Sequence, residues 1–248
     1  MGKGIRCVVV GVGIAGSKME QSHMQTYLEH PRCDLAGIID TSEIQLAAAL
    51  ELWRPYTSEI LASTSYKLLR AVQPEIISIC VPEVSHVHVF WSVLKIWNPS
   101  AILMEKPLAT TPGGCEQIVG ECERRKITLG VNHQRAWDGD FRRMDPPGMI
   151  WHSGPPWRTD VHAHHLAQML GARKIQGQES EDRALMVDGG IARGSGSVRR
   201  NTHAKAISDL ITGIETGKEP ECDGKAGTSA VLATLREREQ RACTPVSG

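Results

Sequence analysis

The stretch that decides the fold of this chain is Ile5-Arg6-Cys7-Val8-Val9-Val10-Gly11-Val12-Gly13-Ile14-Ala15-Gly16, close to its N-terminus. The first half is apolar and β-branched, as in a buried strand, and the second half is a G-x-G-x-x-G turn. Helix-compatible sequence follows from Ile14 to about Leu28. This order of strand, glycine-rich turn and helix predicts the first unit of a parallel α/β sheet.

Each glycine of the turn has a separate physical task. Gly11 permits the tight turn, and Gly13 lacks the Cβ that would keep a pyrophosphate away from the backbone. Gly16 allows the new helix to pack closely on the strand. The free N–H groups at the helix start, at Ile14 and Ala15, are expected to face the phosphates. The positive end of the helix dipole also favours their negative charge. The turn is therefore predicted to bind the pyrophosphate of a dinucleotide.

A second apolar run, Leu35 to Ile39, ends in Asp40. An acidic residue about 20 residues beyond the glycines suits the ribose 2′-hydroxyl of NAD and repels the 2′-phosphate of NADP. Thr41 and Ser42 could hydrogen-bond a phosphate, so NADP stays the alternative cofactor. A plain glycine turn followed by a surface aspartate is the less favoured interpretation, because strand, turn, helix, strand and acid occur in order.

Composition bounds the class of protein. The chain has 248 residues, with 28 basic and 28 acidic side chains, so no global field favours nucleic acid or an anionic membrane. No apolar stretch approaches the roughly 20 residues of a membrane span, and the first strand leaves no room for a signal peptide. The seven cysteines include no C-x-x-C pair. These features predict a cytoplasmic protein without structural disulfides or a zinc cluster.

Strands and helices alternate through the first half of the chain, which requires crossovers and therefore a parallel, doubly wound sheet. Ligands of such sheets bind beyond the carboxyl ends of the strands. The expected strand ends carry the glycine turn, Asp40, Pro82, Glu105-Lys106-Pro107 and Asn132. The expected later elements are helices 42–52, 84–96 and 112–126 and strands 75–81, 101–104 and 127–131.

Four of these features together resemble the Gfo/Idh/MocA family of oxidoreductases. They are the glycine turn, Asp40, Val81-Pro82 with His86, and Glu105-Lys106-Pro107-Leu108-Ala109. The resemblance implies an α/β fold with a Rossmann domain, here residues 1–131, and a second α/β domain with an open sheet. It also implies that Lys106 contacts the reacting hydroxyl. The cofactor-binding residues that follow are Gly11, Gly13, Ile14, Ala15, Gly16, Asp40, Thr41, Val81, Pro82, His86, Glu105, Lys106 and Pro107.

The second half departs from the family pattern at the expected catalytic helix, Asp160 to Gly171. The family places an aspartate, three residues and then a histidine there. His162 matches the histidine, but Arg158 stands four residues earlier, and Asp160 is not spaced to rebuild the pair. Lys106 and His162 are thus the predicted catalytic residues. The predicted substrate-binding residues are Lys106, Asn132, Arg135, Arg158 and His162.

His162, His164 and His165 invite a metal interpretation. His162 and His165 share a helix face, whereas His164 does not, and no carboxylate or cysteine is suitably spaced to complete the shell. We therefore expect no metal, and helix-surface positions for His164 and His165.

The second domain, residues 132–248, is expected to be shortened. Residues 172–200 can supply about one hairpin, formed by Ala184–Val187 and residues 197–199, before two helices at 203–216 and 228–241. A small open sheet leaves edges that need covering. We therefore expect a homo-oligomer, most simply a two-fold dimer.

Two functions are open at this point. The first is an NAD(P)-dependent dehydrogenase or reductase acting on a hydroxyl or carbonyl of a sugar, cyclitol or related small polar metabolite. The second keeps the dinucleotide without redox turnover, as a sensor, a regulatory partner or an enzyme that uses bound NAD structurally. The intact Glu105-Lys106-Pro107 segment favours the first, and Arg158 favours the second.

Overall fold

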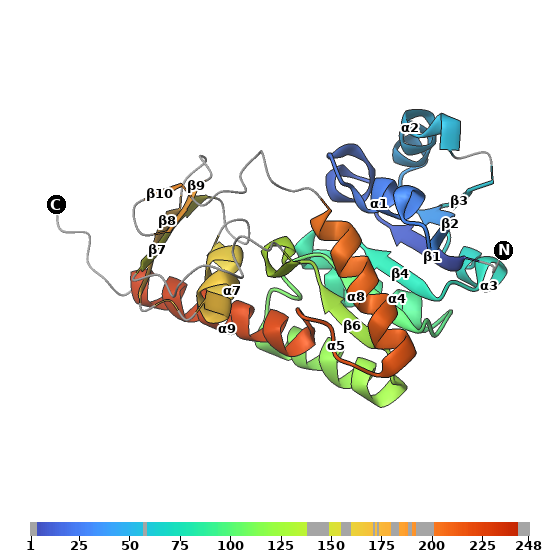
Figure 1. The fold of residues 1–248 in the computed structure, drawn as a ribbon. Helices are drawn as coiled ribbons and strands as arrows, with labels where there is room; N and C mark the ends of the chain where they lie inside the picture. The colour runs from blue at the N-terminus through green and yellow to red at the C-terminus, as the bar shows by residue number, and fades with distance from the viewer. Residues whose placement is uncertain are drawn as a thin grey trace.

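The computed structural model of the chain contains two β-sheets with helices packed around them (Figure 1). It describes residues 4–56, 59–137, 149–154, 160–170, 172, 174–179, 184–187, 190–191 and 201–242. The larger sheet is built from the first half of the chain, and the smaller one lies at the opposite end of the molecule in Figure 1.

The larger sheet has six parallel strands in the order β3-β2-β1-β4-β5-β6. The strands are β1 (Ile5–Val10), β2 (Cys33–Ile39), β3 (Leu61–Ser63), β4 (Ile76–Ile79), β5 (Ala101–Met104) and β6 (Thr128–Val131). This is the strand order of a doubly wound Rossmann sheet, in which the chain reverses direction next to β1. The predicted fold class is confirmed.

Both faces of this sheet are buried, as the nearly continuous apolar strands require. Val8 and Val10 of β1 pack on one face with α3 (Leu68–Val72), α4 (His86–Leu94) and α5 (Pro112–Arg125). Cys7 and Val9 pack on the other face. The helices on that second face are α1 (His23–Glu29), α2 (Glu43–Leu52) and α8 (Thr202–Thr216). Helix α8 thus brings a late part of the chain onto the first sheet.

The smaller sheet has four strands in the order β10-β9-β7-β8. They are β7 (Met149–Gly154), β8 (Lys174–Glu179), β9 (Ala184–Val187) and β10 (Gly190–Ile191). Helix α7 (Asp160–Leu170) packs beside it, with Ala163, Ala167 and Leu170 around Ile150. Helix α9 (Gly224–Ala242) contacts both α5 and α7 and lies at the lower left of Figure 1.

The expectation of about one hairpin in residues 172–200 was wrong, because the structure places β8 there as well, parallel to β7. The hairpin strand Ala184–Val187 is present as β9, and it pairs with β7 and β10. Residues 197–199 lie outside the described residues. The division of the chain at residues 131 and 132 stays a prediction.

The continuous helix expected from Ile14 to Leu28 was also wrong. A short π-helical turn, η1 (Ile14–Lys18), ends first, and α1 then begins at His23. The side chain of Ser22 caps α1 by accepting a hydrogen bond from the backbone N–H of Gln25. Gln21, just before that cap, has a positive φ of 55°, which a continuous helix does not allow.

The remaining elements of the first sheet lie near their predicted positions. Ser42 and Thr111 cap α2 and α5 with their hydroxyl groups, and Pro112 opens α5. Two short 3-10 turns, η3 (Glu83–Ser85) and η4 (Gln134–Trp137), follow strands β4 and β6, and a third, η2 (Arg54–Tyr56), follows α2. Of the described helices, none is both long enough and apolar enough to cross a bilayer.

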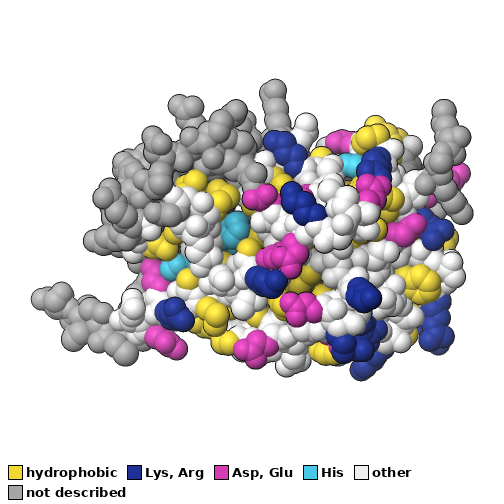
Figure 2. Space-filling model, turned by 60° about the horizontal axis from the view of Figure 1, so that its bottom comes forward, with side chains coloured by type: hydrophobic (Ala, Val, Ile, Leu, Met, Phe, Trp, Pro, Cys, Tyr) yellow, Lys and Arg dark blue, Asp and Glu magenta, His cyan; other side chains and the backbone are white. Residues whose placement is uncertain are grey.

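The surface charge is mixed. Figure 2 shows lysine and arginine side chains interspersed with aspartate and glutamate on the face it presents. This distribution agrees with the equal numbers of basic and acidic residues in the sequence.

Candidate functional site

The carboxyl ends of the six parallel strands bring the predicted strand-end residues to one edge of the sheet. β1 leads into the glycine turn, β2 into Asp40, β4 into Val81 and Pro82, β5 into Glu105, and β6 into Asn132. This is the edge at which open α/β sheets bind their ligands.

The glycine turn has the geometry that a dinucleotide requires. Gly11 has a φ of +87°, and a Cβ on it would lie 2.8 Å from the carbonyl group of Cys80. A Cβ on Gly16 would lie 1.9 Å from the carbonyl oxygen of Gly11, so the helix start packs directly on the turn. Gly13 faces open space, with no atom within 4 Å of where its Cβ would be. The residues present therefore fit a pyrophosphate above Gly13.

Asp40 is held against the turn by two backbone hydrogen bonds. Its Oδ2 accepts from the N–H of Val12 at 2.9 Å, and its Oδ1 accepts from the N–H of Ser42 at 2.9 Å. Each carboxylate oxygen keeps a further lone pair that can accept a ribose hydroxyl. Thr41 is exposed beside it. Asp40 is thus oriented before any ligand binds.

Two exposed aliphatic side chains flank this edge. Ile14, at the start of η1, is 74% exposed, and Val84, in the turn after β4, is 80% exposed. Large apolar side chains that stay exposed beside a candidate site indicate a surface that a ligand covers. They suit the flat rings of a dinucleotide.

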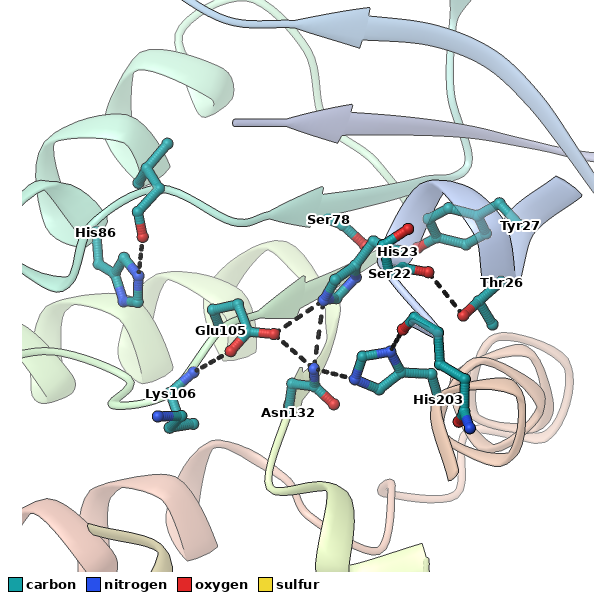
Figure 3. Close-up of polar contacts among 12 residues, drawn as sticks. Ser22, His23, Thr26, Tyr27, Ser78, His86, Glu105, Lys106, Asn132 and His203 are labelled. Carbon is teal, nitrogen blue, oxygen red and sulfur yellow. Dashed lines mark hydrogen bonds and ion pairs between the residues drawn. The ribbon is translucent and has the colours of Figure 1, made fainter. Parts of the chain in front are cut away.

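His86 does not point at this open edge. It is buried, its Nδ1 lies 2.8 Å from the carbonyl oxygen of Pro107, and its Nε2 lies 3.0 Å from that of Val81. The imidazole therefore ties the loop after β4 to the loop after β5. Figure 3 shows His86 with one of these two contacts. In this structure His86 supports the predicted cofactor-binding segments through their backbone.

Glu105 is the centre of a buried polar network (Figure 3). Its Oε1 accepts hydrogen bonds from His23 Nε2 at 3.0 Å and from Asn132 Nδ2 at 2.6 Å. Its Oε2 lies 3.3 Å from the backbone N–H of Lys106, which donates to it. The carboxylate is thus fixed by groups from α1 and from the segments that follow β5 and β6.

The network continues in two directions. On one side, His23 Nδ1 lies 2.9 Å from Ser78 Oγ, which lies 2.7 Å from the hydroxyl of Tyr27. On the other side, Asn132 Nδ2 lies 2.8 Å from His203 Nε2. His203, from the first turn of α8, uses its Nδ1 to contact the backbone carbonyl of Gln21. Residues from α1, β4 and α8 and from the ends of β5 and β6 therefore meet around one carboxylate.

The electrostatics of the network keep Glu105 ionised. Burial alone would raise the pKa of this carboxyl, but the hydrogen bond that His23 donates outweighs burial. Together with the charge of Lys106, this hydrogen bond lowers the pKa of Glu105 below its usual value. Burial raises the pKa of Tyr27 well above its usual value, so the phenol at the far end stays neutral.

Three of these groups are of the types that ligate metals, and His23 Nε2, His203 Nε2 and a carboxylate oxygen of Glu105 lie within 4.8 Å of one another. The amide nitrogen of Asn132 lies among them, at 3.3, 2.8 and 2.6 Å from the three atoms. A hydrogen-bond donor therefore fills the position that a cation would take. The expectation of no metal stays a prediction.

The structure describes the side chains of only some of the predicted catalytic and substrate-binding residues. Lys106 is half-buried at the end of β5, beside Glu105, and its peptide bond to Pro107 is cis. Asn132 is buried, with its amide directed into the network. Arg135 lies in η4 and His162 in α7, but their side chains, and all of Arg158, are outside the described residues.

The aspartate, three residues, histidine spacing is met in α7 by Asp160 and His164, a match that the sequence analysis missed. Both side chains are buried, which corrects the expectation of a surface position for His164. Asp160 Oδ2 lies 2.5 Å from an Arg238 guanidinium nitrogen, and His164 Nε2 lies 2.7 Å from Glu237 Oε2. In this structure the pair faces α9. His165 is also buried, and it stacks on His133 with ring centroids 4.3 Å apart.

Comparisons with known proteins agree with the geometry of the first sheet. Residues 5–133 match the model of an oxidoreductase family with an NAD-binding Rossmann fold. No curated protein sequence gives a significant match to the chain.

Solved structures share the fold at low sequence identity. GenD2 from gentamicin A biosynthesis, solved with NAD, superposes with a TM-score of 0.77 at 14% identity, over 98% of this chain and 95% of that one. UDP-N-acetylglucosamine 3-dehydrogenase GnnA from Acidithiobacillus ferrooxidans gives a TM-score of 0.71 at 17% identity, over 96% and 97% of the two chains. Myo-inositol dehydrogenase from Lactobacillus casei, solved with NAD(H) and myo-inositol, gives a TM-score of 0.69 at 14% identity, over 99% and 98%.

Proposed function

Because the chain belongs to the Gfo/Idh/MocA oxidoreductase family, we propose that it transfers a hydride between NAD and a hydroxyl or carbonyl carbon of a sugar, cyclitol or related small polar metabolite. The observation that carries this proposal is the meeting of the open glycine turn, the oriented Asp40 and Lys106 at one edge of the sheet. The reaction class rests on the family, and the division of labour rests on the chain's own residues.

In this proposal NAD, when bound, supplies the nicotinamide carbon that accepts or gives the hydride. Lys106 holds the reacting oxygen and moves its proton at Nζ. Glu105, kept anionic by its network, fixes the backbone of Lys106 through its hydrogen bond to the Lys106 N–H. We assign substrate oxygens to Arg135 and Arg158, and an assisting role to His162.

The substrate class draws on the similar structures. One is named for UDP-N-acetylglucosamine and another was solved with myo-inositol, and both ligands are rings rich in hydroxyl groups. The mixed charge of the surface in Figure 2 accords with a small polar substrate. We test this by following NADH formation with a panel of inositols, aldoses and nucleotide sugars. Turnover of none of them, by protein that binds NAD, contradicts the proposal.

One observation favours the second function, in which NAD binds without redox turnover. Asp160 and His164 have the spacing of the family's catalytic pair, yet they contact Arg238 and Glu237 of α9. In these contacts the Asp160 carboxylate and one ring nitrogen of His164 are engaged with α9. If the protein is a sensor or regulatory partner, we expect it to bind NADH tightly. We then expect no hydride transfer with any substrate of the panel.

The cofactor preference is a first prediction. Asp40 should accept the adenosine ribose hydroxyls and repel a 2′-phosphate, so NADH should bind at least about 10-fold more tightly than NADPH. Asp40→Asn keeps an acceptor for the Val12 or Ser42 N–H but removes the charge, and should narrow this ratio. Titration of nicotinamide fluorescence measures both affinities. Equal or tighter NADPH binding by the wild type would count against the role of Asp40.

Assembly is a second prediction. The smaller sheet ends in the outer strands β10 and β8, and such edges are commonly covered by a second subunit. We propose a two-fold dimer formed through this part of the chain. Light scattering at micromolar concentration should give the mass of two chains. The mass of one chain would contradict the proposal.

A further inference from the structure

His203 lies far from Glu105 along the chain, but it closes the network around that carboxylate. It is 1% exposed and belongs to the first turn of α8, whereas Glu105 follows β5. Its Nε2 contacts the amide of Asn132, and its Nδ1 contacts the carbonyl of Gln21. No predicted site residue comes from α8, so the contact adds a new part of the fold to the site.

The contacts fix where each hydrogen lies. A backbone carbonyl only accepts, so His203 Nδ1 carries a hydrogen toward Gln21, and its Nε2 accepts from Asn132. The two amide hydrogens of Asn132 then go to His203 Nε2 and Glu105 Oε1. His23 donates the remaining hydrogen to Glu105 through Nε2.

The contacts of His23 with Ser78 and of Ser78 with Tyr27 agree with this assignment of hydrogens. With Nε2 of His23 as the donor, its Nδ1 accepts from the hydroxyl of Ser78, which in turn accepts from Tyr27. Every donor in the chain of contacts therefore has an acceptor. Within the described residues, the Asn132 Oδ1 atom alone among these atoms is buried without a hydrogen-bond partner.

The unpartnered Oδ1 of Asn132 indicates that His203 sets the orientation of the Asn132 amide. Rotating the Asn132 amide by a half turn would give its oxygen neighbours but would set it against the Glu105 carboxylate, also an acceptor. The lone pair of His203 Nε2 stabilises the present orientation, because it takes the second amide hydrogen. The charge of Lys106 contributes to the lowered pKa of Glu105, so the carboxylate and Lys106 interact.

We propose that His203 is a positioning residue for hydride transfer. It fixes the Asn132 amide, and the amide fixes the Glu105 carboxylate that holds Lys106 at the reacting oxygen. The inference rests on the proposed function for its kinetic consequence, whereas the hydrogen assignments stand on the contacts themselves. Helix α8 is thereby a part of the catalytic edge as well as a cover for the sheet.

The kinetic test compares three histidine variants. His203→Leu should lower kcat by about 10-fold, with little change in KM and a shifted pH profile of kcat. His203→Gln should recover most of the activity, because its side-chain oxygen can accept from Asn132 while its amide donates to Gln21. The matched control is His30→Leu. His30 is also buried and also contacts α8, through Ser208 Oγ at 2.9 Å, but it lies outside the network.

A double variant tests whether His203 acts on catalysis through Glu105. If His203 acts through Glu105, its effect on kcat should vanish in a Glu105→Gln background. An equal loss of kcat in His30→Leu, or no recovery in His203→Gln, would overturn the proposal. The proposal would also be overturned if the losses of kcat from His203→Leu and Glu105→Gln were additive in the double variant. Should His203→Leu fail to fold by circular dichroism, the comparison of His203→Gln with His203→Asn carries the same test, since the shorter side chain falls short of Asn132.

A readout without turnover distinguishes a failure here from a failure of the proposed function. Nitrogen NMR of the wild-type protein should show His203 protonated at Nδ1 and unprotonated at Nε2, with His23 protonated at Nε2. The opposite tautomer of His203, or a stoichiometric metal found by elemental analysis, would overturn the assignments. If the NMR result is as expected but the wild type shows no hydride transfer, only the proposed function fails.

Discussion

Replacing Lys106 by alanine is expected to lower kcat by about 10²–10⁴-fold and to leave the affinity for NADH within about twofold of the wild type. The reason is that Lys106 Nζ moves the proton of the reacting oxygen in our account, whereas the dinucleotide is held by the glycine turn and Asp40. Initial rates of NADH formation and a fluorescence titration of NADH measure the two quantities.

Two control variants sharpen this prediction. Lys106→Arg keeps the positive charge but should recover little activity, because a guanidinium stays protonated at neutral pH. Lys67→Ala removes an exposed lysine at the start of α3 and should change neither quantity. Full activity in Lys106→Arg would show that charge alone is needed, and wild-type activity in Lys106→Ala would remove Lys106 from the reaction.

The second large effect is expected from Gly13→Ala, which should weaken NADH binding by about 100-fold, or roughly 2.7 kcal/mol. The added methyl group would meet no atom of the protein within 4 Å, so the melting temperature should stay close to that of the wild type. It would instead project into the space that we assign to the pyrophosphate. Calorimetry of unfolding and fluorescence titration separate the two effects.

Gly120→Ala is the matched control for this variant. Gly120 lies in the middle of α5, and a Cβ there also meets nothing within 4 Å. This substitution should raise stability by about 0.5–1 kcal/mol, because alanine is the better helix former, and should leave NADH binding unchanged. Equal NADH affinities in Gly13→Ala and the wild type would place the pyrophosphate elsewhere.

Much of the first sheet could be predicted because its signals are local. The strand Ala101–Met104 was predicted to the residue, since a short apolar run ends at the polar Glu105. Ser42 and Thr111 mark helix starts with side chains that satisfy free backbone N–H groups. The Rossmann order then follows, because consecutive parallel strands need helical crossovers.

The elements that were missed depend on partners distant in sequence. Strand β8, Lys174-Ile175-Gln176-Gly177-Gln178-Glu179, has one aliphatic residue, and its strand conformation comes from pairing with β7. Strand β3 is three residues long and pairs with β2. The break between η1 and α1 follows from the positive φ of Gln21 and the Ser22 cap, which no hydrophobic period indicates.

The candidate site divides in the same way. Asp40 and Lys106 could be placed because each directly follows a predicted strand. His23 and His203 could not, because each lies on a helix with ordinary apolar spacing and meets Glu105 only in three dimensions. Asp160 and His164 have the family's spacing of an aspartate, three residues and a histidine. The sequence analysis instead matched His162 to the family's histidine, and so it found Arg158 at the position of the aspartate.

The measurement that tests the central claim most directly is the transfer of deuterium from a substrate carbon to NAD in a single turnover. A substrate that turns over in the panel is prepared with deuterium on the carbon bearing the reacting hydroxyl. The wild-type protein is mixed with it and with NAD, and the mass of the NADH formed is determined. The account predicts NADH one deuterium heavier than the unlabelled product, formed at a greatly reduced rate by Lys106→Ala. NAD that binds tightly and stays unreduced by every substrate of the panel would contradict it.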